Sequence, residues 1–320
     1  MTALGEENQR NRHDPAEAFK AIGNETRLAI LWELATVNER PISFTELRKR
    51  VGMRDGSQFN YHLNKLVPGF VERTDEGFHL SHAGDNVIQA IVAGNFIVHP
   101  TVSAFAVEGE CVTCNGILHA RFDHDQVVIT CADCNQYHYM AVFPPGGQVG
   151  RTPEEVVEAS DRKLRADYLV FMAGICPRCA SRTDQTVLGR SDAVASSDLC
   201  IKLEAHFDDF PGPGVVYECE QCDALAFLTM GETLLFEPTV IEFFRDQGHT
   251  LAEIPLWTLP WCIPATSHEY TTVLTDDPLT VRVGIPLNDE VLWVTLDDTL
   301  SVVTAARTKR ADSATKSDAE

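Results

Sequence analysis

The chain has 320 residues, which exceeds one small module and favours two or three domains. Hydrophobic residues make up 44% of the chain, and no stretch approaches the roughly 18 consecutive apolar residues of a membrane span, so the composition predicts a soluble globular protein. The first 13 residues lack the basic and apolar regions of a secretory signal. We therefore expect a cytoplasmic protein with reduced cysteines.

The charge of the chain is strongly negative and unevenly distributed. Lys and Arg number 26 against 47 Asp and Glu, a net charge of −21, and only seven of the 26 are Lys. This composition resembles that of proteins from salt-loving archaea, in which carboxylates keep the surface hydrated. Residues 1–99 carry a net charge of only −2, and residues 100–320 carry −19. A near-neutral N-terminal third in such a chain indicates a surface that faces phosphates.

Residues 14–95 are predicted to form a helical domain after a disordered tail at residues 1–13. Asp14 and Pro15 are typical of a helix start, and the helix that follows carries Phe19 and Ile22. In a second helix, four apolar residues recur at helical spacing and predict one buried face: Leu28, Leu31, Trp32 and Ala35. A later helix has an apolar stripe that is a candidate dimer face, formed by Val87, Ile88, Ile91 and Val92.

Residues 42–67 predict two helices joined by a short turn. Ser43 and Glu46 have the spacing of a capping box at the start of the first helix. The second helix covers residues 57–67 and turns three apolar residues inward, namely Phe59, Leu63 and Leu66. The opposite face has no carboxylate and consists of Arg54 at its entrance, Ser57, Gln58, Tyr61, Asn64 and Lys65. Guanidinium and amide groups suit contacts with phosphates and base edges.

A predicted β-hairpin at residues 70–80 follows these helices and would form a wing. Together, residues 18–31, 59–66, 70–71 and 77–78 resemble an ArsR-type winged helix-turn-helix, in the form common in archaeal regulators. The resemblance implies a homodimer on an approximately palindromic double-stranded DNA site, with helix 57–67 in the major groove. The residues predicted to touch bases or phosphates are Arg54, Ser57, Gln58, Tyr61, Asn64, Lys65 and Arg73. The cysteine site of metal-sensing members of that family is absent, since the first cysteine is Cys111.

Eight of the ten cysteines form four CxxC pairs: Cys111 and Cys114, Cys131 and Cys134, Cys176 and Cys179, and Cys219 and Cys222. Two such pairs bring four thiolates to one Zn²⁺ in a closed tetrahedral site. The spacing predicts two structural Zn²⁺ sites in tandem zinc ribbons, the first with its helix at residues 105–167 and the second at 168–237. Disulfides and redox centres are the alternatives. Four thiolates leave no open catalytic position, and no catalytic motif occurs, so we expect no enzyme activity.

Other candidates carry a weaker signal. His119, His124 and His138 lie near the first quartet, and we interpret them as surface or strand residues rather than ligands. Cys200 and Cys262 have no CxxC partner, and we expect them to be small buried hydrophobic residues. Trp257, Trp261 and Trp293 are interpreted as packing residues.

Residues 238–305 predict a small α+β domain. The expected elements are a helix at 239–247 and strands at 270–274, 279–285, 290–296 and 300–303. The polar segment 306–320 is expected to be disordered.

The sequence as a whole predicts an α+β protein. An N-terminal winged helix-turn-helix is followed by a β-rich region with two CxxC…CxxC zinc ribbons and by the small C-terminal domain. The predicted function is that of a dimeric, DNA-binding transcriptional regulator whose acidic zinc-ribbon region binds an effector or a partner. The alternative is a zinc-ribbon adaptor protein of the transcription machinery, in which the winged helix makes protein contacts.

Overall fold

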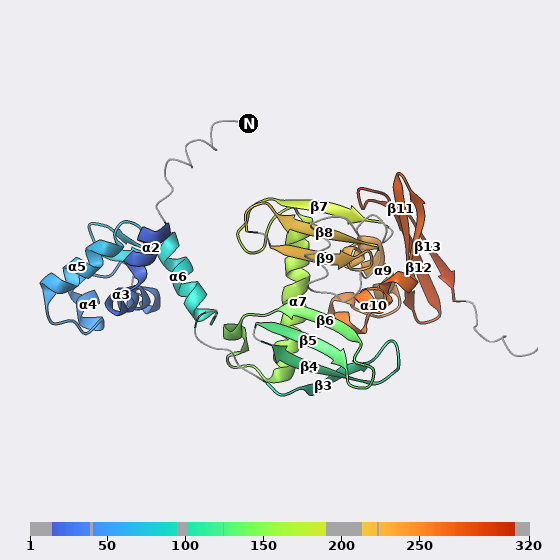
Figure 1. The fold of residues 1–320 in the computed structure, drawn as a ribbon, viewed down its shortest axis with the longest axis horizontal. Helices are drawn as coiled ribbons and strands as arrows, with labels where there is room; N and C mark the ends of the chain where they lie inside the picture. The colour runs from blue at the N-terminus through green and yellow to red at the C-terminus, as the bar shows by residue number, and fades with distance from the viewer. Residues whose placement is uncertain are drawn as a thin grey trace, which may run out of the picture. The chain divides into compact units, whose positions relative to one another are not determined.

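A computed structural model describes residues 15–38, 41–94, 96, 102–123, 125–189, 213–222 and 224–310. The backbone divides into two compact units, Met1–Val98 and His99–Glu320. The described residues form eight α-helices and four antiparallel sheets, a mixed α+β structure (Figure 1). Within these residues, no helix is both long enough and apolar enough to span a membrane.

The first unit consists of helices and one hairpin. Its elements are α2 (Pro15–Ile22), α3 (Glu25–Thr36), α4 (Phe44–Arg50), α5 (Gly56–Leu66), β1 (Val71–Arg73), β2 (Phe78–Leu80) and α6 (His82–Val92). The predicted hairpin is confirmed, with Val71 opposite Leu80 and Arg73 opposite Phe78. Gly77 at its turn has φ +153°, and an added Cβ would lie 2.3 Å from the carbonyl oxygen of Ile42, so only glycine fits there.

The core of the first unit uses a face of α3 that is shifted from the predicted one, with Leu31 buried and Ala35 partly buried as expected. Ile30, Leu31 and Leu34 are buried, whereas Leu28 is 37% and Trp32 is 45% exposed. Apolar residues surround much of this helix, so periodicity alone does not select the stripe that packs. The neighbours α4, α5, α6 and β2 select it.

Half of the capping box predicted for α4 forms. The Ser43 hydroxyl accepts a hydrogen bond from the Glu46 N–H at 3.3 Å. The Glu46 carboxylate instead accepts a hydrogen bond from Arg50 Nε at 3.2 Å. The exposed ion pair one helical turn away therefore replaces the return bond to the N-cap.

The second unit contains three sheets with helices between them (Figure 1). Its first sheet has β3 (Phe105–Glu110), β4 (Ile117–Asp123), β5 (Gln126–Cys131) and β6 (Tyr137–Val142), and α7 (Pro153–Met172) follows. The second sheet has β7 (Thr183–Leu188), β8 (Gly214–Cys219) and β9 (Leu225–Thr229). The next elements are η3 (Glu232–Leu234), α9 (Pro238–Asp246), η4 (Leu251–Glu253), η5 (Leu256–Thr258) and α10 (Pro264–Tyr270). The last sheet has β10 (Thr271–Asp276), β11 (Leu279–Leu287), β12 (Glu290–Leu296) and β13 (Val302–Lys309).

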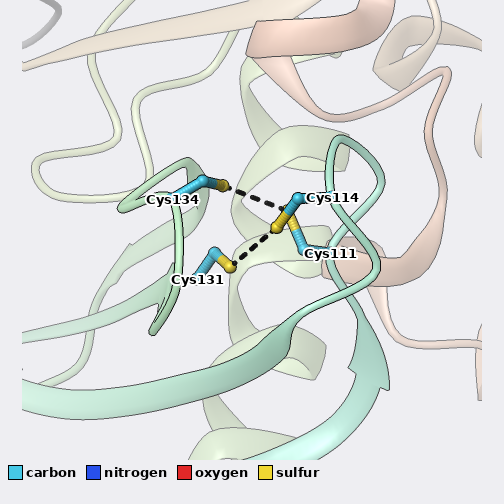
Figure 2. A group of neighbouring side chains, drawn as sticks. All are labelled: Cys111, Cys114, Cys131 and Cys134. Carbon is cyan, nitrogen blue, oxygen red and sulfur yellow. Dashed lines mark hydrogen bonds between the residues drawn. The ribbon is translucent and has the colours of Figure 1, made fainter.

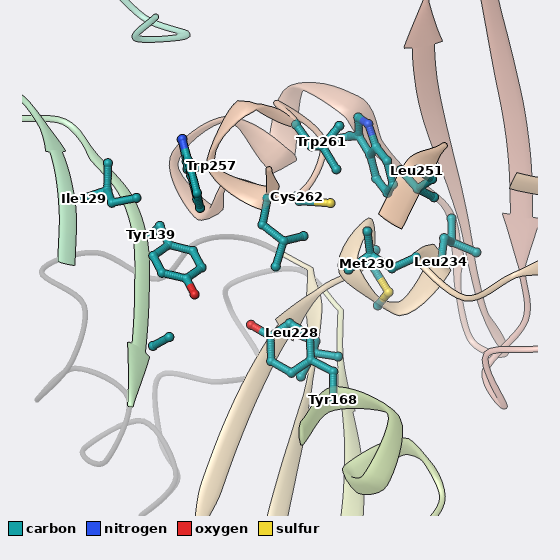
Figure 3. Close-up of a cluster of buried hydrophobic side chains, with 14 of the residues drawn as sticks. Ile129, Tyr139, Tyr168, Leu228, Met230, Leu234, Leu251, Trp257, Trp261 and Cys262 are labelled. Atoms are coloured by element: carbon teal, nitrogen blue, oxygen red, sulfur yellow. The ribbon is translucent and has the colours of Figure 1, made fainter. Parts of the chain in front are cut away.

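One hydrophobic core runs through the whole second unit. Ile129, Leu228 and Val294 come from the three regions that the sequence predicted as separate domains, yet they belong to one buried cluster. Figure 3 shows part of it, where side chains from β5, β6, α7, β9 and the segment 251–262 converge. Trp257, Trp261 and Cys262 are buried there, as expected. The two ribbons and the C-terminal sheet therefore share one core.

The last strand is longer than predicted. β13 extends through Lys309, which pairs with Glu290, so the predicted disordered tail does not begin at residue 306. The last residues of this strand, 306–309, are mostly polar, but β12 supplies a partner along its length, and Trp293 Nε1 donates to Thr308 Oγ1 at 3.0 Å. The predictions for residues 1–13, His124, Cys200 and residues 311–320 lie outside the described residues.

Candidate metal centres and nucleic-acid interface

Four cysteines converge at one end of the first sheet, and we call this group site 1 (Figure 2). Cys111 and Cys114 lie in the turn between β3 and β4, whereas Cys131 ends β5 and Cys134 lies in the turn that leads to β6. The Sγ atoms of Cys111 and Cys134 are 3.6 Å apart, and those of Cys114 and Cys131 are 3.5 Å apart. All four sulfur atoms lie within 4.8 Å of one another.

Four further cysteines form the equivalent group at the second sheet, which we call site 2. Cys176 and Cys179 precede β7, whereas Cys219 ends β8 and Cys222 lies in the turn that leads to β9. The Sγ distances are 3.7 Å between Cys176 and Cys222 and 3.4 Å between Cys179 and Cys219. Both quartets predicted from the CxxC spacing are therefore assembled.

The four CxxC turns share one backbone geometry. In each turn the N–H of the first cysteine donates to the carbonyl oxygen five residues later, at 2.8–2.9 Å: Cys111 to Gly116, Cys131 to Gln136, Cys176 to Ser181 and Cys219 to Ala224. The residue after the second cysteine has positive φ in each of the three turns where it is described, at Asn115, Asn135 and Ala180. This left-handed residue turns the chain back, so that both sulfur atoms of a turn point to the same side.

Backbone N–H groups also point at the buried sulfur atoms. Three donate at 3.4 Å: Asp133 to Cys131, Arg178 to Cys176 and Gln221 to Cys219. The backbone N–H of Cys134 lowers the pKa of Cys131 to about 7. For Cys219, burial raises the pKa, but donation from the N–H groups of Gln221 and Cys222 outweighs it and lowers the pKa to about 7. The thiolate, the form that binds metal, is therefore favoured at Cys131 and Cys219, whereas hydrogen bonds with neighbouring sulfur atoms raise the pKa of Cys114 and burial raises that of Cys179.

The chemistry and spacing of both quartets fit Zn²⁺. Four thiolates at 2.3 Å from a tetrahedral zinc ion lie about 3.8 Å apart, close to the observed sulfur distances. A disulfide requires about 2.05 Å, and all eight cysteines are free. The arrangement is compatible with two zinc ions, each closed off by four sulfur ligands.

Two family models match this chain, and one of them covers the region that contains both sites. A family model described as Domain of unknown function (DUF7351) matches residues 108–302, more than half of the chain. The chain belongs to the DUF7351 family. A second model, described as Domain of unknown function (DUF7347), matches residues 15–91. No curated protein and no solved structure matches the chain. The DUF7351 region contains all eight cysteines of sites 1 and 2.

One predicted strand histidine of the DUF7351 region contacts site 1. His138 on β6 is 2% exposed, and its Nε2 lies 3.3 Å from the Sγ of Cys111. Its Nδ1 lies 3.1 Å from the carbonyl oxygen of Trp257. His119 is half-buried on β4, as expected of a strand residue. His138 is therefore not a fifth ligand but a direct neighbour of one.

Sequence reasoning missed a buried polar group in the DUF7351 region. Arg165 Nε donates to Asp161 Oδ2 at 3.2 Å, and both side chains are buried on α7. The Tyr168 hydroxyl donates to Glu232 Oε1 at 3.0 Å, and burial raises the pKa of Glu232 to about 7. The i,i+4 spacing of Asp161 and Arg165 was a readable signal of an ion pair. Glu232 gave no such signal of burial, because Tyr168 lies 64 residues away in sequence, although its other partner, the N–H of Thr229, is only three residues away.

All the predicted DNA-contact residues are exposed and lie in the region that the DUF7347 model matches. Arg54 precedes α5, Arg73 lies on β1, and the others lie on α5: Ser57, Gln58, Tyr61, Asn64 and Lys65. Lys65 Nζ lies 5.8 Å from the centre of the Tyr61 ring. The prediction overlooked Asp55, which caps α5 and accepts from the N–H groups of Ser57 and Gln58 at 2.7 and 3.1 Å. The exposed face of α5 has no carboxylate, but the carboxylate of Asp55 lies directly before the helix. The N–H groups of Ser57 and Gln58 already donate to it.

Proposed function

We propose that this protein is a DNA-binding transcriptional regulator that reads double-stranded DNA as a homodimer. The main support for the proposal is the exposed face of α5. It presents hydroxyl, amide and cationic side chains and no carboxylate, although the chain as a whole has a net charge of −21. Side chains of these types bind phosphates and the edges of bases in the major groove.

The surroundings of α5 support the same proposal. Phe44 of α4 packs edge-on against Phe59 of α5, with ring centres 5.1 Å apart, and the β1–β2 hairpin follows. Two packed helices followed by a hairpin are the element order of a winged helix-turn-helix, in which the second helix enters the major groove. We infer that α5 is the recognition helix and the hairpin, with Arg73, is the wing.

The three residues Gln58, Tyr61 and Lys65 are spaced at i, i+3 and i+7 and lie along one stripe of α5. A glutamine amide pairs with the two hydrogen-bonding groups of adenine in the major groove, and lysine contacts phosphate as a point charge. We propose that Gln58 reads a base and that Lys65 contacts the backbone. The acidic second unit would repel DNA, so we assign to it an effector or a protein partner instead.

A genome-wide binding experiment tests the proposal. The tagged protein is immunoprecipitated from cells and its bound DNA is sequenced, beside a Gln58→Ala/Tyr61→Ala double variant and a Gln89→Ala control. Gln89 is exposed on α6 and belongs neither to α5 nor to the β1–β2 hairpin. We expect discrete peaks with a two-fold motif that disappear in the double variant and persist in the control. Peaks at all active promoters that survive the double substitution would instead identify the adaptor.

Binding to the recovered site separates the two kinds of contact. Gln58→Ala should weaken binding to that site by about 1–3 kcal/mol and relax the preference at one base pair. Lys65→Ala should weaken binding to all sequences alike and reduce the slope of log affinity against log salt by about 1. Titrations at several salt concentrations measure both effects. An unchanged base preference in Gln58→Ala contradicts the base-reading role.

A further inference from the structure

The two metal sites differ in what surrounds their sulfur atoms. Four residues after the last cysteine of each site, the chain places His138 at site 1 and Ala226 at site 2. His138 is buried, with Nε2 3.3 Å from Cys111 Sγ. Over the described part of the chain, no side-chain nitrogen hydrogen bonds to a sulfur atom of site 2, whose sulfur atoms contact each other and backbone N–H groups.

The other ring nitrogen of His138 connects site 1 to a segment far along the chain. Nδ1 lies 3.1 Å from the carbonyl oxygen of Trp257 in η5, 119 residues away in sequence. The carbonyl oxygen only accepts hydrogen bonds, and so does the sulfur atom of a metal-bound thiolate, so the ring bridges the two when each of its nitrogens carries a hydrogen. One buried imidazole therefore joins a metal-ligating sulfur atom to the backbone of η5.

Trp257 makes further contacts with the strands that hold site 1. Its Nε1 donates at 2.8 Å to the carbonyl oxygen of Glu108, three residues before Cys111. Its ring packs edge-on against Tyr139 on β6, with centres 5.5 Å apart (Figure 3). Gly109 has φ +104°, and an added Cβ would lie 2.6 Å from the Cγ2 of Thr258, so β3 and η5 approach closely. Strands on both sides of site 1 thus contact η5.

Helix α7 anchors the same segment from another direction. The guanidinium group of Arg165 donates to the carbonyl oxygens of Leu251 and Ile254, at 3.5 and 2.6 Å. Residues 251–258 therefore lie between the buried ion pair of α7 and site 1, and none of these contacts involves a cysteine of site 2.

We propose that His138 is a positioning residue that couples the metal at site 1 to residues 251–258, so that each stabilises the other, while the metal at site 2 is not coupled to this segment. Residues that hydrogen bond to a metal ligand orient it and change metal affinity by about 10–100-fold. Coupling is reciprocal, so loosening the segment must also weaken metal binding at site 1.

The first test measures the two zinc affinities of the full-length protein separately. A chelator removes zinc stepwise, and alkylation with mass spectrometry identifies which quartet has been released. His138→Leu should lower the affinity of site 1 by about 10–100-fold and leave site 2 unchanged. The control is His119→Leu, the same substitution on strand β4 of the same sheet without a sulfur contact, and it should change neither site. Equal affinities in His138→Leu and the wild type, or equal losses at both sites, would overturn the proposal.

The reciprocal test acts on the segment rather than on the site. Trp257→Phe removes the donor to Glu108 and should weaken zinc binding at site 1 by roughly 5-fold, with no change at site 2. Trp261→Phe is the matched control, because Trp261 is fully buried but its Nε1 has no hydrogen-bond partner among the described residues. If the two variants weaken site 1 equally, core packing and not coupling is responsible.

Hydrogen exchange gives a readout that does not depend on metal titration. In the zinc-loaded protein, His138→Leu should raise the amide exchange of residues 251–258 above that of His119→Leu, because one anchor of the segment is lost. Exchange around Cys176 and Cys219 should stay at the wild-type rate. Unchanged exchange in residues 251–258 would show that His138 does not hold this segment.

Discussion

The two units of this protein differ in charge and in what stabilises them. The first unit is near neutral, contains no cysteine and packs helices around a core that includes Leu63 and Phe59. The second carries a net charge of −19, and it adds two cysteine quartets to its core. Self-repulsion opposes the compact state of a highly charged unit. Metal-binding turns can offset that repulsion without more apolar surface, whereas the near-neutral first unit packs around an apolar core alone.

Removing a metal ligand should have the largest effect, and it should destabilise only the second unit. Cys131→Ser or Cys219→Ser should each lose one zinc equivalent and on the order of 10 kcal/mol of folding free energy from the second unit. Elemental analysis measures the zinc, and limited proteolysis with mass spectrometry locates the opened region. Residues 15–94 should resist the protease in both variants. Equal digestion of the two units would refute the idea that only the second depends on metal.

A cavity in the core of the first unit should destabilise that unit and leave the metal sites of the second unit intact. Leu63 on α5 is fully buried, so Leu63→Ala should destabilise this unit by about 2–5 kcal/mol. The zinc content should remain at two equivalents. Thermal unfolding followed by circular dichroism measures the loss, and the adjacent exposed Asn64→Ala should stay within about 0.5 kcal/mol of the wild type. A loss of zinc in Leu63→Ala would mean that the units do not fold independently.

The buried Glu232 should give the second unit a pH dependence of its own. Burial raises its pKa from 4.5 to about 7, so between these values the folded state holds a proton that the unfolded chain has released. Stability therefore falls as pH rises through this window, by up to roughly 3 kcal/mol. Glu232→Gln stays neutral and should exceed the wild type in stability at about pH 8, with the difference vanishing near pH 4.5. Urea unfolding at both pH values measures this, and a constant difference would contradict it.

The smallest expected effect concerns the carboxylate that caps α5. Asp55→Ala should cost about 1 kcal/mol, because two helix N–H groups lose their acceptor. Asp55→Asn keeps an oxygen acceptor and should stay within a few tenths of a kcal/mol. If the proposed function is correct, this charge-removing variant should also bind DNA more tightly than the wild type. Chemical unfolding and DNA titration measure the two effects, and equal destabilisation by both variants would show that Asp55 does not act as a cap.

Local signals in the sequence were sufficient for several elements. The CxxC spacing identified both quartets, because the geometry of such a turn depends on a few consecutive residues. The hairpin around Gly77 and the helix that carries Phe59, Leu63 and Leu66 were predicted for the same reason. Periodicity was insufficient on α3, where Leu28 and Trp32 were expected inside and are exposed.

The sequence by itself determined the eight cysteine ligands, the helix–turn–helix–hairpin order and the exposed polar face of α5. Only the tertiary structure decided that His138 contacts Cys111 and Trp257, that Glu232 is buried against Tyr168, and that β13 continues to Lys309. The physical reason is the range of the interactions involved. Turns and helix faces depend on neighbours a few residues apart, whereas a buried polar group or an edge strand depends on partners supplied by distant segments.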